Sequence, residues 1–236
     1  MAEALYDRPL SNDPVERAAW PTPGRKALEG RLIRLEPIDP ARHAAALFAR
    51  AHDGSAAAGR LWDYLGYGPF ESEAAMRSWL EGCATQSDPL FFALVERASG
   101  EPLGMASYLR ITPGQGVIEI GHIWFSPVLQ KTAAATEAIF LLIAHAFETL
   151  GYRRVEWKCN ALNAGSRAAA RRFGFRYEGI FYRHLVVKGR NRDTAWYALI
   201  EDDWPAAGAA FRAWLDPANF DAEGRQRRRL SELMPA

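Results

Sequence analysis

Short runs of apolar residues, divided by turn signals, occupy the middle of the chain. Residues 90–96 and 103–111 are two such runs, and Ser99-Gly100-Glu101-Pro102 between them is typical of a hairpin. After a turn around Pro113-Gly114, residues 117–125 form a third run. The pattern predicts three consecutive strands.

Helical spacing and helix-end residues flank this region. Asp39-Pro40 predicts a helix to about residue 51, with Asp39 as N-cap and proline at the first helical position. Ser72 is expected to cap a short helix that ends near Gly82. Residues 131–150 are predicted to form a long helix that ends at Gly151.

The remaining elements complete a mixed sheet covered by helices. A helix is expected at 166–173, and further strands at 31–35, 153–159, 175–187 and 194–200. The predicted order is β-α-α-β-β-β-α-β-α-β-β, and it contains no internal repeat. This order indicates an α/β (mixed α+β) fold.

The two ends of the chain differ from the middle. Residues 1–26 carry several prolines without helical or strand period, and we interpret them as an N-terminal arm, extended over the surface or disordered. Residues 27–204 are expected to form the main domain. Residues 205–236 are expected to form a C-terminal helical extension packed on that domain, ending in a tail with Arg225, Arg227, Arg228 and Arg229. A solvated helix end is favoured over RNA contact for this tail.

Composition narrows the classes of partner. The chain has 236 residues, 29 Lys plus Arg and 28 Asp plus Glu, with a net charge of +1, so nothing drives it generally toward nucleic acid or anionic lipid. The apolar run 138–144 is too short to span a membrane, which takes about 20 residues. Two separated cysteines and no secretory signal predict a cytoplasmic protein.

One strand-to-helix junction is a candidate anion site. The strand ends at Pro127 and the helix is expected to begin near Lys131. Free backbone N–H groups and the helix dipole favour a phosphate there, and Lys131, Thr132 and Thr136 add a positive charge and hydroxyl groups. The first turn of any Ala-rich helix has a similar sequence, so the spacing alone does not decide whether a phosphate binds here.

Three motifs carry a resemblance. Gln130, Ala133 and Ala135 follow the phosphate-binding signature of the GNAT superfamily of N-acetyltransferases, with alanine where many members have glycine. Asn163 and Ser166, followed by residues 173–179, are similar to its second block, and residues 188–193 to its last hairpin. The chain resembles the branch of ribosomal-protein N-terminal (serine/alanine) acetyltransferases. This implies a central mixed, mostly antiparallel sheet of six to seven strands flanked by helices.

The resemblance also implies how acetyl-CoA, the expected cosubstrate, would bind. Backbone groups of Ile123, Trp124 and Phe125 would pair with its pantetheine arm. The pyrophosphate would lie on the segment after Gln130, and Asn163 and Ser166 would lie near the thioester sulfur. The residues expected to hold the pyrophosphate are Lys131, Thr132, Ala133, Ala134 and Ala135. No metal is expected.

Acetyl transfer requires a base for the acceptor amine. Glu119, His122 and Glu156 are the candidates, and the sequence does not rank the two glutamates. Glu119 and His122 would point to opposite faces of a regular strand unless Gly121 marks a bulge.

Ser166 is the candidate general acid. Ala170 stands where other branches have a tyrosine in this role. Helix capping is the alternative role of Ser166 and also of Asn163.

The sequence leaves the acceptor open. It would be a small-molecule amine or a protein N-terminus, and a homodimer is possible. A non-catalytic acyl-CoA sensor of the same fold and an RNA-associated protein are the alternative functions. Residues 61–70 are expected to wall the acceptor pocket, where Trp62, Tyr64, Tyr67 and Phe70 fit an apolar or cationic group or, equally, core packing.

Overall fold

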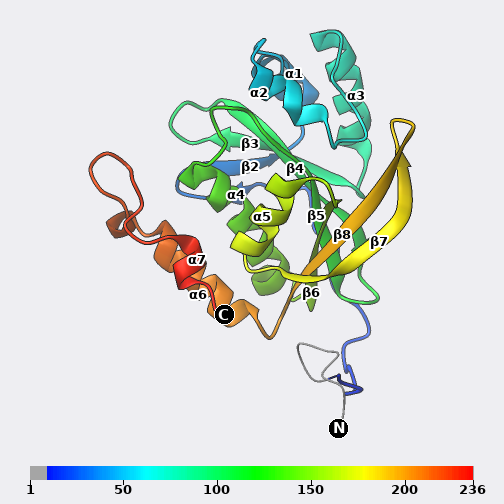
Figure 1. Ribbon diagram of the computed structural model, residues 1–236, viewed down its shortest axis with the longest axis vertical. Coiled ribbons are helices and arrows are strands. Elements are labelled where there is room, and N and C mark those ends of the chain that lie inside the picture. Colours follow the sequence, from blue (N-terminus) through cyan, green and yellow to red (C-terminus); the bar gives the residue numbers. More distant parts are fainter. Residues whose placement is uncertain (1–9, 236) are drawn as a thin grey trace.

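A single sheet of eight strands, in the order β1-β2-β3-β4-β5-β6-β8-β7, organises the computed structural model, which describes residues 10–235 (Figure 1). Every neighbouring pair is antiparallel except β5 and β6, which are parallel. The strands are β1 (Leu28–Glu29), β2 (Ile33–Pro37), β3 (Leu90–Glu96), β4 (Pro102–Thr112), β5 (Val117–Phe125), β6 (Arg154–Asn160), β7 (Arg176–Val187) and β8 (Arg190–Ile200).

Five of the seven α-helices in residues 10–235 begin where the sequence supplies a capping side chain. Asp39 accepts from the Ala41 N–H at 3.0 Å, and Ser72 from the Ala75 N–H at 3.2 Å, as predicted. The α-helices are α1 (Pro40–Ala51), α2 (Ala56–Gly59), α3 (Glu73–Thr85), α4 (Ala133–Ala144), α5 (Ala164–Arg172), α6 (Trp204–Leu215) and α7 (Leu230–Leu233). None of the helices in residues 10–235 is both long and apolar enough to cross a bilayer.

The helices cover both faces of the sheet (Figure 1). On one face α4 packs on apolar side chains such as Phe92 and Ile118, and α5 and α6 join the same core. On the other face α1 and α3 pack on Phe91 and Met105. The mixed, mostly antiparallel fold with flanking helices is therefore confirmed.

A bulge in β5 changes which side chains share a face. Met105 pairs with Trp124, but Ser107 pairs with Gly121, so β5 has one extra residue in this interval. His122 lies in it with a φ of 50°. Before the bulge Ile118 faces α4, whereas after it Trp124 faces α1 and α3. The bulge expected next to Gly121 is confirmed, and it brings Glu119 and His122 to the same face.

The parallel pair β5 and β6 is short. Only Val117 to Glu119 pair with Arg154 to Glu156. Beyond this point β5 stays paired with β4 as far as Phe125, and β6 stays paired with β8 as far as Asn160. The two strands therefore part, and each leaves one backbone edge without a neighbouring strand.

Some expectations are corrected. The strand count of six to seven was wrong, because β1 is only two residues long and too short to leave a pattern. The long helix begins at Ala133 and continues from His145 as a π-helical turn. The first nine residues of the N-terminal arm lie outside the described part. Its later part has no helix, but Trp20 is buried and donates to the Gly151 carbonyl at 2.5 Å.

Glu137 ties α4 to the turn between β1 and β2. Its buried carboxylate accepts from the backbone N–H groups of Arg31 at 3.1 Å, Leu32 at 2.6 Å and Ile33 at 2.9 Å. A Cβ on Gly30 would lie 2.6 Å from the same carboxylate, so only glycine fits there. The contact sets the first strands against the helix that carries the candidate anion site.

Glu137→Gln should therefore lower the free energy of unfolding by about 2–4 kcal/mol, because one carboxylate oxygen becomes an amide group facing N–H donors. Urea denaturation measures this. Glu81→Gln is the matched control, since Glu81 is exposed on α3. Equal stability of the two variants would contradict this role of Glu137.

Candidate active site

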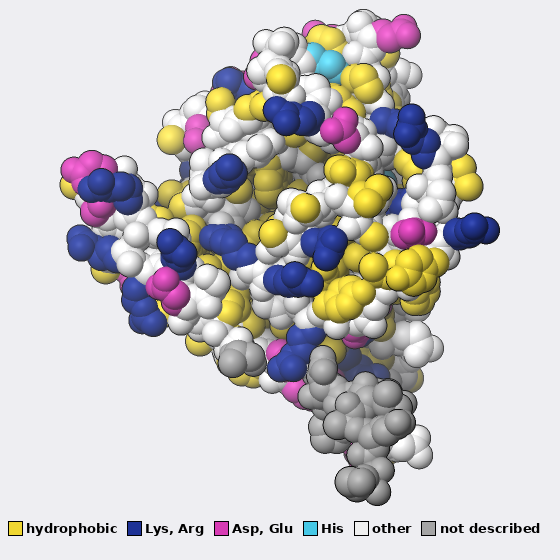
Figure 2. Space-filling model, viewed as in Figure 1, with side chains coloured by type: hydrophobic (Ala, Val, Ile, Leu, Met, Phe, Trp, Pro, Cys, Tyr) yellow, Lys and Arg dark blue, Asp and Glu magenta, His cyan; other side chains and the backbone are white. Residues whose placement is uncertain are grey.

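A cavity of about 1610 Å³ opens where β5 and β6 part. The molecular surface is hollowed in this region, and Lys and Arg side chains lie around the hollow (Figure 2). The cavity is lined by the second half of β5, the start of α4, the second half of β6, α5 and the loop after α2. It therefore joins the predicted anion site to the predicted base and acid residues.

The strand edges inside the cavity are suited to an extended ligand. Ile123, Trp124 and Phe125 line it from β5, and Trp157 to Asn160 line it from β6. Since the facing edges have no strand partner, their backbone N–H and C=O groups can pair with an amide-containing chain. Gln130 donates from Nε2 to the Phe125 carbonyl at 2.9 Å, so this carbonyl already has a donor.

The start of α4 keeps backbone donors available. Thr132 is the N-cap, and its hydroxyl accepts from the Ala135 N–H at 3.1 Å. The N–H group of Ala135 is therefore already bonded within the helix. In the first turn, the N–H groups of Ala133 and Ala134 remain available to a ligand. Lys131 precedes them with a φ of 63° and lines the cavity. This group of donors and one cation fits a phosphate.

Sequence reasoning missed Arg172, a further cation at this end. It lies on α5, lines the cavity, and donates to the Thr136 hydroxyl on α4 at 3.1 Å. Its guanidinium lies 5.0 Å from the ring centre of Trp214 on α6. Burial lowers the pKa of Arg172, and it has no carboxylate partner within the described residues. No local motif marks it, because α4, α5 and α6 meet only in the fold.

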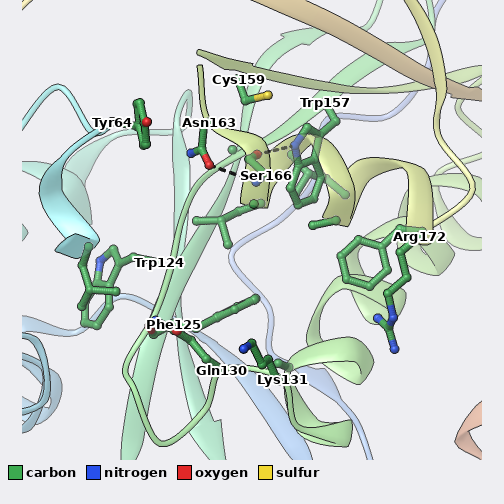
Figure 3. A pocket seen from close by; sticks show the side chains of 18 of the residues that line it. Tyr64, Trp124, Phe125, Gln130, Lys131, Trp157, Cys159, Asn163, Ser166 and Arg172 are labelled. Carbon is green, nitrogen blue, oxygen red and sulfur yellow. Dashed lines mark hydrogen bonds between the residues drawn. The ribbon is translucent and has the colours of Figure 1, made fainter. Parts of the chain in front are cut away.

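Asn163 and Ser166 have different roles at the start of α5 (Figure 3). Asn163 is the N-cap, and its side-chain oxygen accepts from the Ser166 N–H at 3.0 Å. Ser166 is not the cap. Its hydroxyl accepts from the indole N–H of Trp157 at 2.9 Å, which leaves the hydroxyl proton to donate. Both side chains line the cavity.

The two candidate glutamates are neighbours across the parallel pair, and Lys158 joins them. The Lys158 ammonium lies 3.0 Å from Glu119 and 2.5 Å from Glu156. Glu119 also binds Arg110 at 2.6 Å, and Glu156 binds Arg154 at 2.8 Å. Glu119 lines the cavity, whereas Glu156 does not. The positions of the two glutamates relative to the cavity therefore distinguish them as candidate bases, which the sequence did not do.

Ion pairs also act on the pKa of Glu156. Burial raises it, but hydrogen bonds from Lys158 and Arg154 outweigh burial and hold it below its usual value. The carboxylate is therefore stabilised in its charged form.

His122 lines the cavity among aromatic rings. Its ring stacks on Tyr67 with centres 5.6 Å apart and lies 5.0 Å from Phe91. Burial, with added repulsion from Arg110 and Arg192, lowers the pKa of His122 to about 4. The imidazole is therefore neutral near pH 7.

Residues 61–70, which are expected to wall the acceptor pocket, include some that line the cavity and some that pack in the core. Leu61, Asp63, Tyr64 and Leu65 line the cavity. Trp62 instead packs with Phe70 and Trp124 in the core beneath α1 and α3. Among residues 10–235 no group of three or more potential ligands that could hold a metal ion occurs.

Comparison with known proteins gives consistent matches. The acetyltransferase (GNAT) domain family matches residues 32–176. A GCN5-related N-acetyltransferase from Brucella melitensis is 45% identical with a TM-score of 0.89, covering 92% of this chain and 98% of that chain. A probable acetyltransferase of the GNAT family from Chromobacterium violaceum is 42% identical with a TM-score of 0.76, covering 84% and 98%.

Two more distant similarities bear on fold and on sequence. RimJ from Mycobacterium smegmatis, solved in complex with CoA-disulfide, is 24% identical with a TM-score of 0.65, covers 77% of this chain and 88% of that chain, and shows the fold alone. The uncharacterized N-acetyltransferase YnaD from Bacillus subtilis is 29% identical over 92 residues. That match covers 39% of this chain and about half of YnaD, 53% of its length.

The bond between Trp157 and Ser166 predicts coupled stability effects. Ser166→Ala should cost about 1–3 kcal/mol, because the buried indole N–H loses its acceptor. In a Trp157→Phe background the same change should cost close to nothing. Urea denaturation of the four proteins in this cycle measures the coupling. Equal cost in both backgrounds would contradict the bond.

Proposed function

Since this chain belongs to the GNAT family of acetyltransferases, we propose that it transfers an acetyl group from acetyl-CoA to a primary amine on a small molecule or a protein N-terminus. One observation carries the proposal. The cavity between the parted strands runs from a helix start rich in N–H donors and cations to a carboxylate that faces the same space.

The residues at the first end suit acetyl-CoA. The N–H group of Ala133 and the ammonium of Lys131, which both belong to residues that line the cavity, would hold the pyrophosphate, with the N–H group of Ala134 next to them in the first turn of α4. The free edges of β5 and β6 would pair with the amides of the pantetheine arm. Arg172 would neutralise a further phosphate charge. When bound, acetyl-CoA supplies the thioester carbonyl carbon that a neutral amine attacks.

Glu119 is the base in this proposal. An ammonium group has no lone pair, so the acceptor must lose a proton before it can react. Glu119 accepts this proton at a carboxylate oxygen, directly or through a water molecule, because it lines the cavity while Glu156 lies outside it. Lys158, held by Glu119 and Glu156, fixes the carboxylate. His122 lines the same cavity, but its ring lies against Tyr67 and Phe91.

Ser166 is the acid. The Trp157 indole N–H holds one lone pair of the Ser166 oxygen, so the hydroxyl proton can point into the cavity. Ser166 therefore donates a proton to the departing sulfur. Asn163 supports this geometry by capping α5 through the Ser166 N–H.

Ala133→Glu tests the phosphate end. The new carboxylate should remove the rise in melting temperature that acetyl-CoA produces, by steric overlap and like charge. The free variant should keep its stability, because an acidic residue in the first helical turn is favourable. Ala209→Glu, exposed on α6, should keep the full shift. A normal shift in Ala133→Glu would overturn the assigned phosphate site.

Glu119→Gln tests the base. Turnover near pH 7 should fall by about a hundredfold or more, while acetyl-CoA affinity stays close to that of the wild type. Glu156→Gln is the matched variant, because it binds the same lysine but does not line the cavity, and its loss should be smaller. The measurement is thiol release with a panel of amines. A larger loss in Glu156→Gln would reverse the ranking.

A further inference from the structure

Arg192, on β8, is a cation in the cavity for which the described residues supply no counter-ion. It is half-buried and lines the cavity, and its Nε is buried with no hydrogen-bond acceptor. Within residues 10–235 no carboxylate lies within ion-pair distance of it. Its charge acts on both His122 and Cys159, so it lies at the reacting end rather than at the phosphate end.

The neighbouring charges are already paired. Glu119 is shared by Arg110 and Lys158, and Glu156 by Lys158 and Arg154. Asp193, adjacent in sequence, accepts instead from the Arg183 N–H at 2.7 Å and from the Asn191 amide at 3.0 Å. The guanidinium of Arg192 therefore has no carboxylate partner among the described residues at the end of the cavity near Glu119.

A half-buried cation without a partner is unfavourable, and burial is the main cause of a lowered pKa at Arg192. Arg110 adds to this effect, whereas Cys159 and Glu119 oppose it. Such a residue is expected where a ligand completes the pairing. A planar guanidinium binds a carboxylate through two parallel hydrogen bonds.

We infer that the acceptor is an amine that carries a carboxylate close by, with the carboxylate bound by Arg192 and the amine directed to Glu119. This rests on the proposed acetyl transfer. The two charged groups of a zwitterionic acceptor would then each meet the opposite charge, its ammonium at Glu119 and its carboxylate at Arg192. A polyamine or other multiply cationic acceptor would meet Arg192 with like charge. The carboxylate belongs either to a free amino acid or to an acidic residue next to a protein N-terminus.

Matched acceptors test the inference. Thiol release from acetyl-CoA is measured with glycine, leucine and phenylalanine against their α-carboxamides, and with peptides beginning Ser-Glu against Ser-Gln. In at least one arm the carboxylate member should have a kcat/KM higher by about tenfold or more. The arm that responds identifies the source of the carboxylate. Equal or faster reaction of the neutral members in both arms would overturn the inference.

Arg192→Met should bring the ratio of carboxylate to neutral acceptor close to one. Its melting temperature should equal or exceed that of the wild type, because no partner is lost. Arg190→Met, an exposed change on the same strand, should keep the wild-type ratio. A fall in Arg192→Met by the same factor for both acceptors would mean that the guanidinium does not act through the carboxylate, and the inference would fall.

A binding measurement separates this inference from the proposed reaction. The N-acetyl derivatives of the same amino acids and peptides, with their neutral counterparts, are titrated calorimetrically into the CoA-loaded protein. Tighter binding of the carboxylates, lost in Arg192→Met, would support the site even if no amine released thiol. Absent or equal binding of the two kinds would overturn it.

Discussion

The parting of β5 from β6 is the constraint on which the site depends. Three residue pairs join these strands before each follows its other neighbour. A continued pair would occupy the backbone edges that we propose pair with a pantetheine arm, and would close the cavity. The bulge at His122 acts at the same point, because it turns the end of β5 and places Glu119, His122 and Trp124 on one face.

Charge is distributed unevenly along the cavity that results. At the end near α4, Lys131 and Arg172 have no acidic partner in the described part of the chain, which suits phosphates. At the other end a compact network of Arg110, Lys158 and the two glutamates is internally paired, and Arg192 is left outside it. Buried pairs of this kind stabilise little, but they fix the position of a carboxylate. The arrangement accounts for a carboxylate, the proposed base, that is held in place beside a cation with no partner in the described part of the chain.

The sequence predicts what local chemistry determines. The caps Asp39 and Ser72, the succession of the longer strands and helices along the chain, and the bulge next to Gly121 each follow from a few adjacent residues, and the structure has them. It could not rank Glu119 against Glu156, because the two differ only in where the neighbouring strand departs. Arg172 and Arg192 carried no signal, since their lack of counter-ions depends on elements far apart in the chain.

A crystal structure of the protein with CoA tests the central claim most directly. The account predicts the pyrophosphate within hydrogen-bond distance of the Ala133 and Ala134 N–H groups, and the pantetheine arm between β5 and β6 with its sulfur near Ser166. CoA bound elsewhere on the molecule, or strands β5 and β6 paired along their full length in the complex, would contradict it.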